Sequence, residues 1–315
     1  MPAGSRLAVL GAPLRSSLVT TGTEDAARPL RTFAVSGAGI AGVEVEDAGD
    51  LSLPAPGDSD FLAGGPVPKN ESRVRESLLT LAGRVAEKVR AGSIPVVFGG
   101  DATVLVGVLA GLLDGQESSP RIGLVSLDGF ARFRTPEEQP GGDLSLMVLA
   151  LATGRGPASV THLARNRFPL VQETDVLLAG VRDADPEEAT ALVRSHVSLL
   201  TPDRLQGNEG VAAFMGALGR LTQRSREVVL HIDASVLDPA LFPAAVGSSS
   251  PGGLSLERVR TLGRELATWN VAGTIRIAAA SISGVDARKD PGGVRMHELA
   301  GFVLRLFGRP GAETS

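Results

Sequence analysis

The chain alternates short, continuous apolar segments with longer stretches in which apolar residues recur every three or four positions. The short segments predict buried strands at residues 7–10, 95–98, 122–127, 175–180, 228–232 and 275–280. The longer stretches predict helices at 70–91, 102–113, 144–152, 187–195, 256–268 and 294–307. Strands that alternate with helices favour a three-layer α/β/α fold with a mainly parallel sheet, covered on both faces.

The same pattern gives no reason to divide the 315 residues into several domains. No charge run, long linker or composition break interrupts the chain, so residues 1–308 are predicted to form a single α/β domain and 309–315 a disordered tail. Residues 49–68, rich in Gly, Pro and Asp, are the main predicted loop. No apolar run has the roughly 18–20 residues of a membrane-spanning helix, and the first apolar run reads as a strand rather than a signal peptide. A cytoplasmic protein is expected.

Composition narrows the possible partners and chemistry. The net charge of −4 and the pI near 5.7 give no electrostatic argument for binding nucleic acid or an anionic membrane. The chain has no cysteine, which excludes disulfides, thiolate nucleophiles and cysteine-ligated metals. Its four histidines, at 162, 196, 231 and 297, have no spacing typical of metal ligands.

Acidic residues follow several predicted strands. They are Asp101, Asp128, the pair Asp183 and Asp185, and the pair Asp233 and Asp238. Since ligands of open α/β sheets bind beyond the carboxyl ends of the strands, the set as a whole predicts one site. Any one of these aspartates, taken alone, is better explained as a loop or helix cap, so no single residue carries that prediction.

The order of these motifs resembles that of the ureohydrolase family, which comprises arginases, agmatinases and formiminoglutamases. The segments that carry the resemblance are 47–51 (DAGDL, similar to "DxGDL"), 98–101 (FGGD, to "GGDH"), 127–136 (LDGFARFRTP, to "DAHADINTP"), 180–186 (GVRDADP, to "GxRDxDP"), 231–239 (HIDASVLDP, to "SFDVDGLDP") and 250–255 (SPGGLS, to "PVGGLS"). The resemblance implies an arginase-like fold and association into trimers or hexamers. It also implies hydrolysis of guanidino or amidino groups by two manganese ions that share a bridging hydroxide.

By that resemblance, two histidines and four aspartates hold the metal pair, and this sequence departs from most of them. Ala102 stands for the histidine of "GGDH", Phe130 and Arg132 for the histidine and second acid of "DAHAD", and Ser235 for the second acid of "DVD". The retained ligand positions are Asp128 and Asp233. A binuclear manganese centre is therefore not expected, no other cofactor is predicted, and metal-dependent hydrolysis of a guanidino group is not expected.

Other positions of the family site differ as well. Ser145, two residues after Asp143, stands for a histidine that the family places near the substrate guanidinium. Asp185, which in the family faces the substrate end of the site, is kept.

Arg132 places a positive charge where the family has a ligand acid. A unit charge pair at 4 Å is worth about 4 kcal/mol at an effective dielectric of 20, so this residue would repel a dication. Our hypothesis is that Arg132 replaces the metals by pairing with Asp128 or Asp233, with Arg134 bringing further positive charge. The alternative is that Arg132 turns out to solvent.

His231 lies two residues before Asp233 and shares its face of the strand by alternation. We interpret it as a strand histidine satisfied by hydrogen bonds, with a lone general base as the alternative. The glycine-rich segment 247–253 is interpreted as a turn before the next helix, or as a cradle for an anion.

The sequence thus predicts a ureohydrolase-fold pseudoenzyme that acts as a structural or regulatory subunit. It would form a homo-oligomer or associate with an active paralogue. One alternative is a metal-independent enzyme or small-molecule binder that uses the inherited cleft, and another is an active arginase or agmatinase. The residues of that cleft are Asp101, Asp128, Arg132, Arg134, Asp143, Ser145, Asp185, His231, Asp233 and Ser235.

Overall fold

The fold is organised around one sheet of eight strands, in the order β2-β1-β3-β8-β7-β4-β5-β6. The computed structural model describes residues 6–16, 22–40, 43–54, 68–118, 120–138, 141–247 and 250–308. Each strand pair within these residues is parallel. The strands are β1 (Arg6–Ala12), β2 (Glu44–Asp50), β3 (Ser93–Gly99), β4 (Ile122–Leu127), β5 (Val176–Ala179), β6 (Ser198–Leu200), β7 (Glu227–Asp233) and β8 (Arg276–Ser283).

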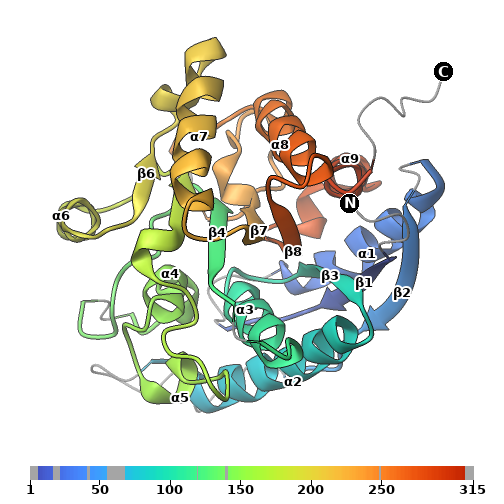
Figure 1. Cartoon of the computed structure of the whole chain (residues 1–315), viewed down its shortest axis with the longest axis horizontal. Helices are drawn as coiled ribbons and strands as arrows, with labels where there is room; N and C mark the ends of the chain where they lie inside the picture. Colours follow the sequence, from blue (N-terminus) through green and yellow to red (C-terminus); the bar gives the residue numbers. More distant parts are fainter. Residues whose placement is uncertain are drawn as a thin grey trace.

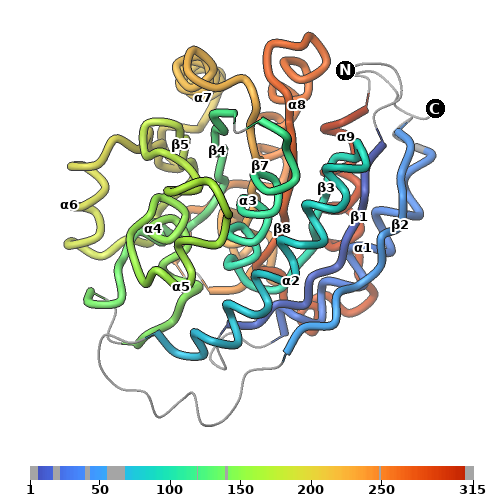
Figure 2. Tube along the Cα trace, turned by 60° about the horizontal axis from the view of Figure 1, so that its bottom comes forward, coloured from blue at the N-terminus to red at the C-terminus, as the bar shows by residue number. Residues whose placement is uncertain are grey.

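Helices cover both faces of this sheet (Figure 1). One face carries α1 (Ala27–Ser36), α7 (Gly207–Thr222), α8 (Leu256–Val271) and α9 (Val294–Arg305). The other, on the near side in Figure 2, carries α2 (Glu71–Arg90), α3 (Val104–Gly115), α4 (Val148–Ala152) and α5 (Ala158–Thr161). Helix α6 (Pro186–Arg194) lies towards the β6 edge. Short 3₁₀ turns are η1 (Glu24–Ala26), η2 (Ala38–Ile40), η4 (Leu144–Leu146), η5 (Glu173–Asp175), η6 (Asp203–Leu205), η7 (Ala234–Val236) and η8 (Ala287–Lys289).

The strands separate two apolar cores. In β4, Leu124 packs into the core beneath α2 and α3, whereas Val125 and Leu127 contribute to the core beneath α7, α8 and α9. Because both faces are covered, the strand is apolar without interruption, which is the pattern that predicted it. The predicted three-layer α/β/α class with a parallel sheet is confirmed, and we propose that residues 1–308 form one domain because every described strand belongs to this sheet.

Some elements differ from the sequence-based expectation. Residues 144–152 contain the turn η4 and the short helix α4 instead of one helix. The sixteen-residue helix α7 was not predicted because four glycines weaken its helical signal. Strand β2 was missed because it is an acidic edge strand whose charges are paired, as in Glu46 with Lys88 at 2.6 Å. Residues 55–67 of the predicted loop and the predicted tail 309–315 lie outside the described residues.

Loops at the carboxyl ends of the central strands are tied together by main-chain hydrogen bonds. The amide of Gly284, after β8, donates to the carbonyl of Gly100, after β3, at 3.0 Å. The amide of Asp128, after β4, donates to the carbonyl of Ala179 at the end of β5, also at 3.0 Å. These bonds fix the edge of the sheet at which the predicted acidic residues lie.

Helices α2 and α3 approach closely through glycines of α3. A Cβ atom at Gly111 would lie 2.5 Å from the carbonyl oxygen of Ala82 and 2.6 Å from Cβ of Val85. By contrast, Gly83 is exposed on α2, and a Cβ atom there would meet nothing within 4 Å.

We expect Gly111→Ala to destabilise the protein by about 1–3 kcal/mol, because the added methyl group meets backbone and forces the two helices apart. The matched control, Gly83→Ala, should stabilise it by up to about 1 kcal/mol through helix propensity alone. Denaturant unfolding followed by circular dichroism measures both changes. Equal stabilisation by the two substitutions would contradict the close packing of α2 on α3.

Candidate functional site

The loop after β4 carries the first acid of the site and is held against the loop after β5. The amides of Arg182 and Asp183 both donate to the carbonyl of Gly129, at 2.9 and 3.0 Å, and Phe130 forms an isolated β-bridge with Asp183. Asp128 is therefore fixed at the carboxyl end of β4 with its side chain buried.

Arg132 turns the same loop back towards that acid. Its backbone adopts the left-handed region, with φ of 50°, which is uncommon for a residue other than glycine. Its carbonyl accepts hydrogen bonds from the amides of Leu149 and Ala150, at 2.9 and 3.2 Å, which hold this conformation.

The guanidinium of Arg132 bridges the two retained acids. Its Nε donates to Asp128 Oδ2 at 2.6 Å, and its Nη2 lies 3.1 Å from Asp233 Oδ1. Its Nη1 donates to the carbonyl of Ser145 at 2.7 Å. The side chain is only 8% exposed, so it is not turned to solvent, and it contacts both acids between which the sequence left the choice open.

The remaining lone pairs of the two carboxylates are satisfied by neighbouring groups. Asp128 Oδ1 accepts from the Phe130 amide and from Ser235 Oγ, each at 2.9 Å. Asp233 accepts from the Ser235 amide at 3.0 Å and from Ser283 Oγ at 2.7 Å. Both carboxylates thus combine one shared cation with local hydrogen bonds, as buried charges require.

Burial and charge shift the protonation equilibria of this group. Burial raises the pKa of Asp128 to about 6, with the charge of Arg132 opposing the rise. Burial is also the largest single effect on Asp233, but the charge of Arg132, the neighbouring His231 and the hydrogen bonds from Ser235 and Ser283 together outweigh it, so the pKa of Asp233 lies below its ordinary value. The two acids in turn outweigh the effect of burial on Arg132 and raise its pKa, so the guanidinium stays charged.

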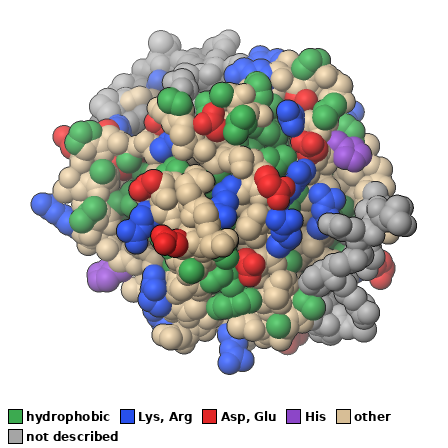
Figure 3. All heavy atoms as spheres, turned by 90° about the horizontal axis from the view of Figure 1, so that it is seen from above, with side chains coloured by type: hydrophobic (Ala, Val, Ile, Leu, Met, Phe, Trp, Pro, Cys, Tyr) green, Lys and Arg blue, Asp and Glu red, His purple; other side chains and the backbone are tan. Residues whose placement is uncertain are grey.

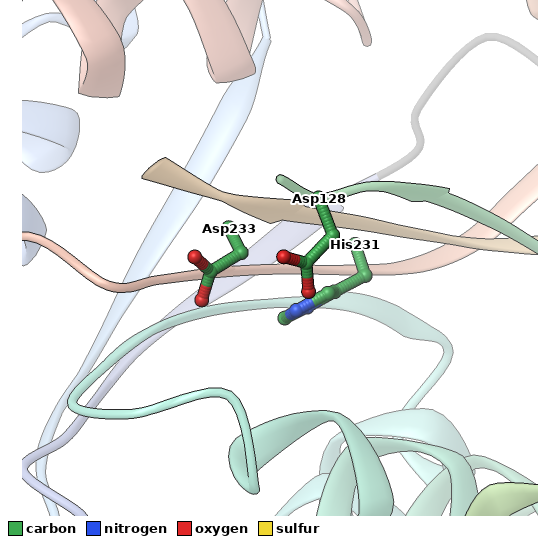
Figure 4. A group of neighbouring side chains, drawn as sticks. All are labelled: Asp128, His231 and Asp233. Carbon is green, nitrogen blue, oxygen red and sulfur yellow. The ribbon is translucent and has the colours of Figure 1, made fainter. Parts of the chain in front are cut away.

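His231 lies on β7 beside the two acids (Figure 4). Its Nδ1 is 2.8 Å from Ser281 Oγ, and its Nε2 is 3.5 Å from Ser283 Oγ. Burial lowers the pKa of His231 to about 4, so the ring is neutral near pH 7. These contacts agree with a satisfied strand histidine. One ligand atom from each of Asp128, His231 and Asp233 lies within 4.8 Å of the others, a spacing that can hold a metal ion.

The other positions of the predicted site are distributed around this centre. Ala102 is buried in the apolar core beneath α2 and α3. Phe130 packs against Gly247, and its ring centroid lies 5.1 Å from Cζ of Arg132. Ser235 is buried and accepts from the amide of Gly129 at 3.1 Å.

Three predicted acids have local structural partners. Asp101 accepts from the amides of Ser16 and Thr103, at 2.6 and 3.0 Å, and Asp143 accepts from the amide of Ser145 at 2.9 Å. Asp185 caps α6 by accepting from two amides of its first turn. These bonds match the capping alternative for single aspartates.

A cavity of about 560 Å³ opens beside Arg132. Arg134 lies in its wall and pairs with Asp185, so Arg134 does not add its charge to the Asp128–Asp233 pair as anticipated. The wall comprises Phe130, Arg132, Arg134, Leu146, Arg182, Asp183, Ala184, Asp185, Glu188, Gly247 and Ser250.

Sequence reasoning missed several residues that complete the site. Ser281 and Ser283 lie opposite His231 and Asp233 in the parallel register of β7 and β8. The sequence shows that these two serines alternate along β8. It does not show that they contact His231 and Asp233, because that depends on β7 and β8 being neighbours in the sheet. Glu188, which accepts from the Phe133 amide at 2.7 Å, follows a helix cap and gave no separate signal.

Comparison with known proteins agrees with this architecture. An arginase of Bacillus caldovelox is 28% identical to this chain over 214 residues, which cover 67% of this chain and 69% of that arginase. Homo sapiens arginase-1 is 27% identical over 268 residues, which cover 81% of this chain and 79% of arginase-1. The solved structure of the Bacillus caldovelox arginase has a TM-score of 0.87 at 23% identity, covering 98% of this chain and 99% of that one. The model of the arginase family matches residues 5–281. Since this match spans well over half of the sequence, the chain belongs to the arginase family.

Proposed function

We propose that this arginase-family chain is a pseudoenzyme that does not hydrolyse guanidino groups with a metal pair, and that it acts as a structural or regulatory subunit. The observation that carries the proposal is the Arg132 guanidinium, which bonds Asp128 at 2.6 Å and lies 3.1 Å from Asp233. A cation supplied by the chain itself thus offsets part of the negative charge of the two acids that stand at family ligand positions.

The donor set at the remaining family positions does not fit two manganese ions. Ala102 and Phe130 offer no lone pair, and Arg132 offers only donors and a positive charge. Ser235 offers a hydroxyl, but that group already donates to Asp128 and accepts from Gly129. Hard divalent cations are held by carboxylate and imidazole ligands, of which too few stand at these positions.

Charge balance supports the same proposal. Two aspartates and one guanidinium leave a formal charge of −1, whereas the four aspartates of the family offset the +4 of two Mn²⁺ ions. At about 4 Å from the guanidinium, a dication would meet a repulsion of roughly 8 kcal/mol at an effective dielectric of 20. The family metals and Arg132 therefore exclude each other.

The subunit role is proposed from the family resemblance, which implies trimers or hexamers, either of this chain alone or with an active paralogue. On the face drawn in Figure 3, described Lys and Arg side chains lie interspersed with Asp and Glu, as expected of a protein that does not bind nucleic acid. Among the described residues, no helix is long and apolar enough to cross a membrane. The cytoplasmic location expected from the sequence remains a proposal.

A second candidate function is binding of a small molecule in the inherited cleft. The cavity of about 560 Å³ favours it, since this volume lies within the range of ligand pockets. Arg134 and the acids Asp185 and Glu188 in its wall offer charges of both signs. Such a ligand would sit beside Arg132 without displacing it.

Purified protein incubated with Mn²⁺ is expected to release no urea from arginine, agmatine or guanidinobutyrate above a protein-free blank, because the nucleophile-generating metal pair is not held. Metal analysis after dialysis should give well under one Mn per chain. The Bacillus caldovelox arginase serves as the positive control. Two bound Mn per chain together with turnover would overturn the proposal.

Sedimentation analysis and purification from the native source separate the two candidate functions. For the subunit role we expect a trimer or hexamer, or co-purification with a ureohydrolase that has an intact ligand set. For the binder we expect the melting temperature of the isolated chain to rise with a small amine, guanidine or carboxylate, and the response to a carboxylate to be lost in Arg134→Ala. A monomer without a ligand response would contradict both.

Arg132→Met keeps an unbranched apolar stem and leaves the backbone conformation required at this position unchanged, but removes the guanidinium and its charge. We expect it to destabilise the protein by about 3–5 kcal/mol, because Asp128 and Asp233 remain buried without a cation. The control is Arg264→Ala, which removes an exposed pair with Glu257 and should change stability by less than about 1 kcal/mol. Denaturant unfolding measures both, and equal small losses would show that the internal bridge contributes little.

A further inference from the structure

A cation site remains in this protein, and its geometry indicates a single cation rather than a pair. Asp128 follows β4, while His231 and Asp233 come from β7, and the two strands are hydrogen-bonded neighbours. One ligand atom of each residue lies within 4.8 Å of the others, and all three side chains are buried. Figure 4 shows the three side chains gathered at this point of the sheet.

Asp128 and Asp233 direct oxygen atoms at the guanidinium. Within the described part of the chain, Asp128 Oδ2 accepts only from Arg132, so removing that side chain would leave this oxygen without a partner. Asp233 Oδ1 would keep a single hydrogen bond, from the Ser235 amide. Gly284, at φ of 75°, leaves room for the Asp233 carboxylate, since a Cβ atom there would lie 2.6 Å from Oδ1.

His231 adds a donor that Arg132 does not use. Ser281 Oγ holds its Nδ1 at 2.8 Å, whereas its Nε2 has only the 3.5 Å contact with Ser283 Oγ. A hydrogen bond to one ring nitrogen fixes the orientation in which the other can ligate a metal. Two carboxylates and one imidazole form a donor set suited to Mn²⁺, Co²⁺ or Zn²⁺.

We propose that Asp128, His231 and Asp233 form a single-cation site whose cation in the folded chain is the Arg132 guanidinium, and that removal of this side chain exposes a site for one divalent metal ion. The Arg132 side chain then competes with a metal ion for the two carboxylates. The inference rests on the proposed function, in that Arg132 stands in place of the family metals. It adds that the remaining acids keep a metal-binding geometry of their own, with His231 as a ligand at a position outside the family set.

The test compares metal binding to the wild-type chain and to Arg132→Gly. Glycine removes the guanidinium side chain and also tolerates the left-handed backbone at this position, so backbone strain does not destabilise the variant. With Co²⁺ as the probe, we expect Arg132→Gly to bind one ion per chain in equilibrium dialysis, with visible absorption typical of nitrogen and oxygen ligands. At a hundredfold excess over Kd, the melting temperature should rise by about 5 °C. The wild-type chain should show neither effect.

Two control variants identify the ligands. Arg132→Gly combined with His231→Leu should bind Co²⁺ at least about tenfold more weakly, because one ligand is lost. Arg121→Ala removes an arginine that pairs with a different fully buried acid, Asp175. This variant should bind no Co²⁺ in the same dialysis experiment. If Arg132→Gly does not fold alone, its refolding yield should be restored by Co²⁺ and not by Na⁺.

Three outcomes would overturn the inference. They are a folded Arg132→Gly variant that binds no Co²⁺, equal binding by wild type and variant, and unchanged affinity after His231→Leu. Urea release by the wild-type chain is measured in a separate assay, so failure of this inference is distinguishable from failure of the proposed function.

Discussion

The arrangement of the site depends on one buried interaction, in which the guanidinium of Arg132 is shared between Asp128 and Asp233. The two acids end neighbouring parallel strands and would repel each other if they were buried without a cation. A planar guanidinium has donors on several sides and can contact both acids and the Ser145 carbonyl at the same time. The left-handed backbone at Arg132 is the conformational cost of aiming the side chain inward, and the amides at the start of α4 help to hold it.

The residues that stand at the family ligand positions fit together in charge and polarity. By the correspondence that the resemblance implies, Arg132 and Ser235 stand for two ligand acids and lower the negative charge of the centre, and one guanidinium and a few hydroxyl groups contact the two acids that are present. By the same correspondence, Ala102 and Phe130 stand for two histidines and bring no polar side chain that would be buried without a metal.

The sequence predicts those features of the fold and the site that depend on residues close together along the chain. Continuous apolar segments located the central strands well, as with β4, and motif order indicated the family. The acidic edge strand β2 and the glycine-containing α7 were missed because their stability comes from ion pairs and packing that neither pattern reveals. In the site, the inward position of Arg132 was anticipated from charge. Its contact with both acids, and the role of Ser283, depend on the adjacency of β4, β7 and β8, which is a non-local property.

The strand-end acids of this fold have structural tasks that do not depend on a metal. Asp101, Asp143 and Asp185 accept main-chain hydrogen bonds that begin or cap the following turn or helix. Asp128 and Asp233 do the same for the Phe130 and Ser235 amides. These acids therefore hold the geometry of their loops. The sheet edge keeps its shape so long as some cation offsets the two acids that are buried together.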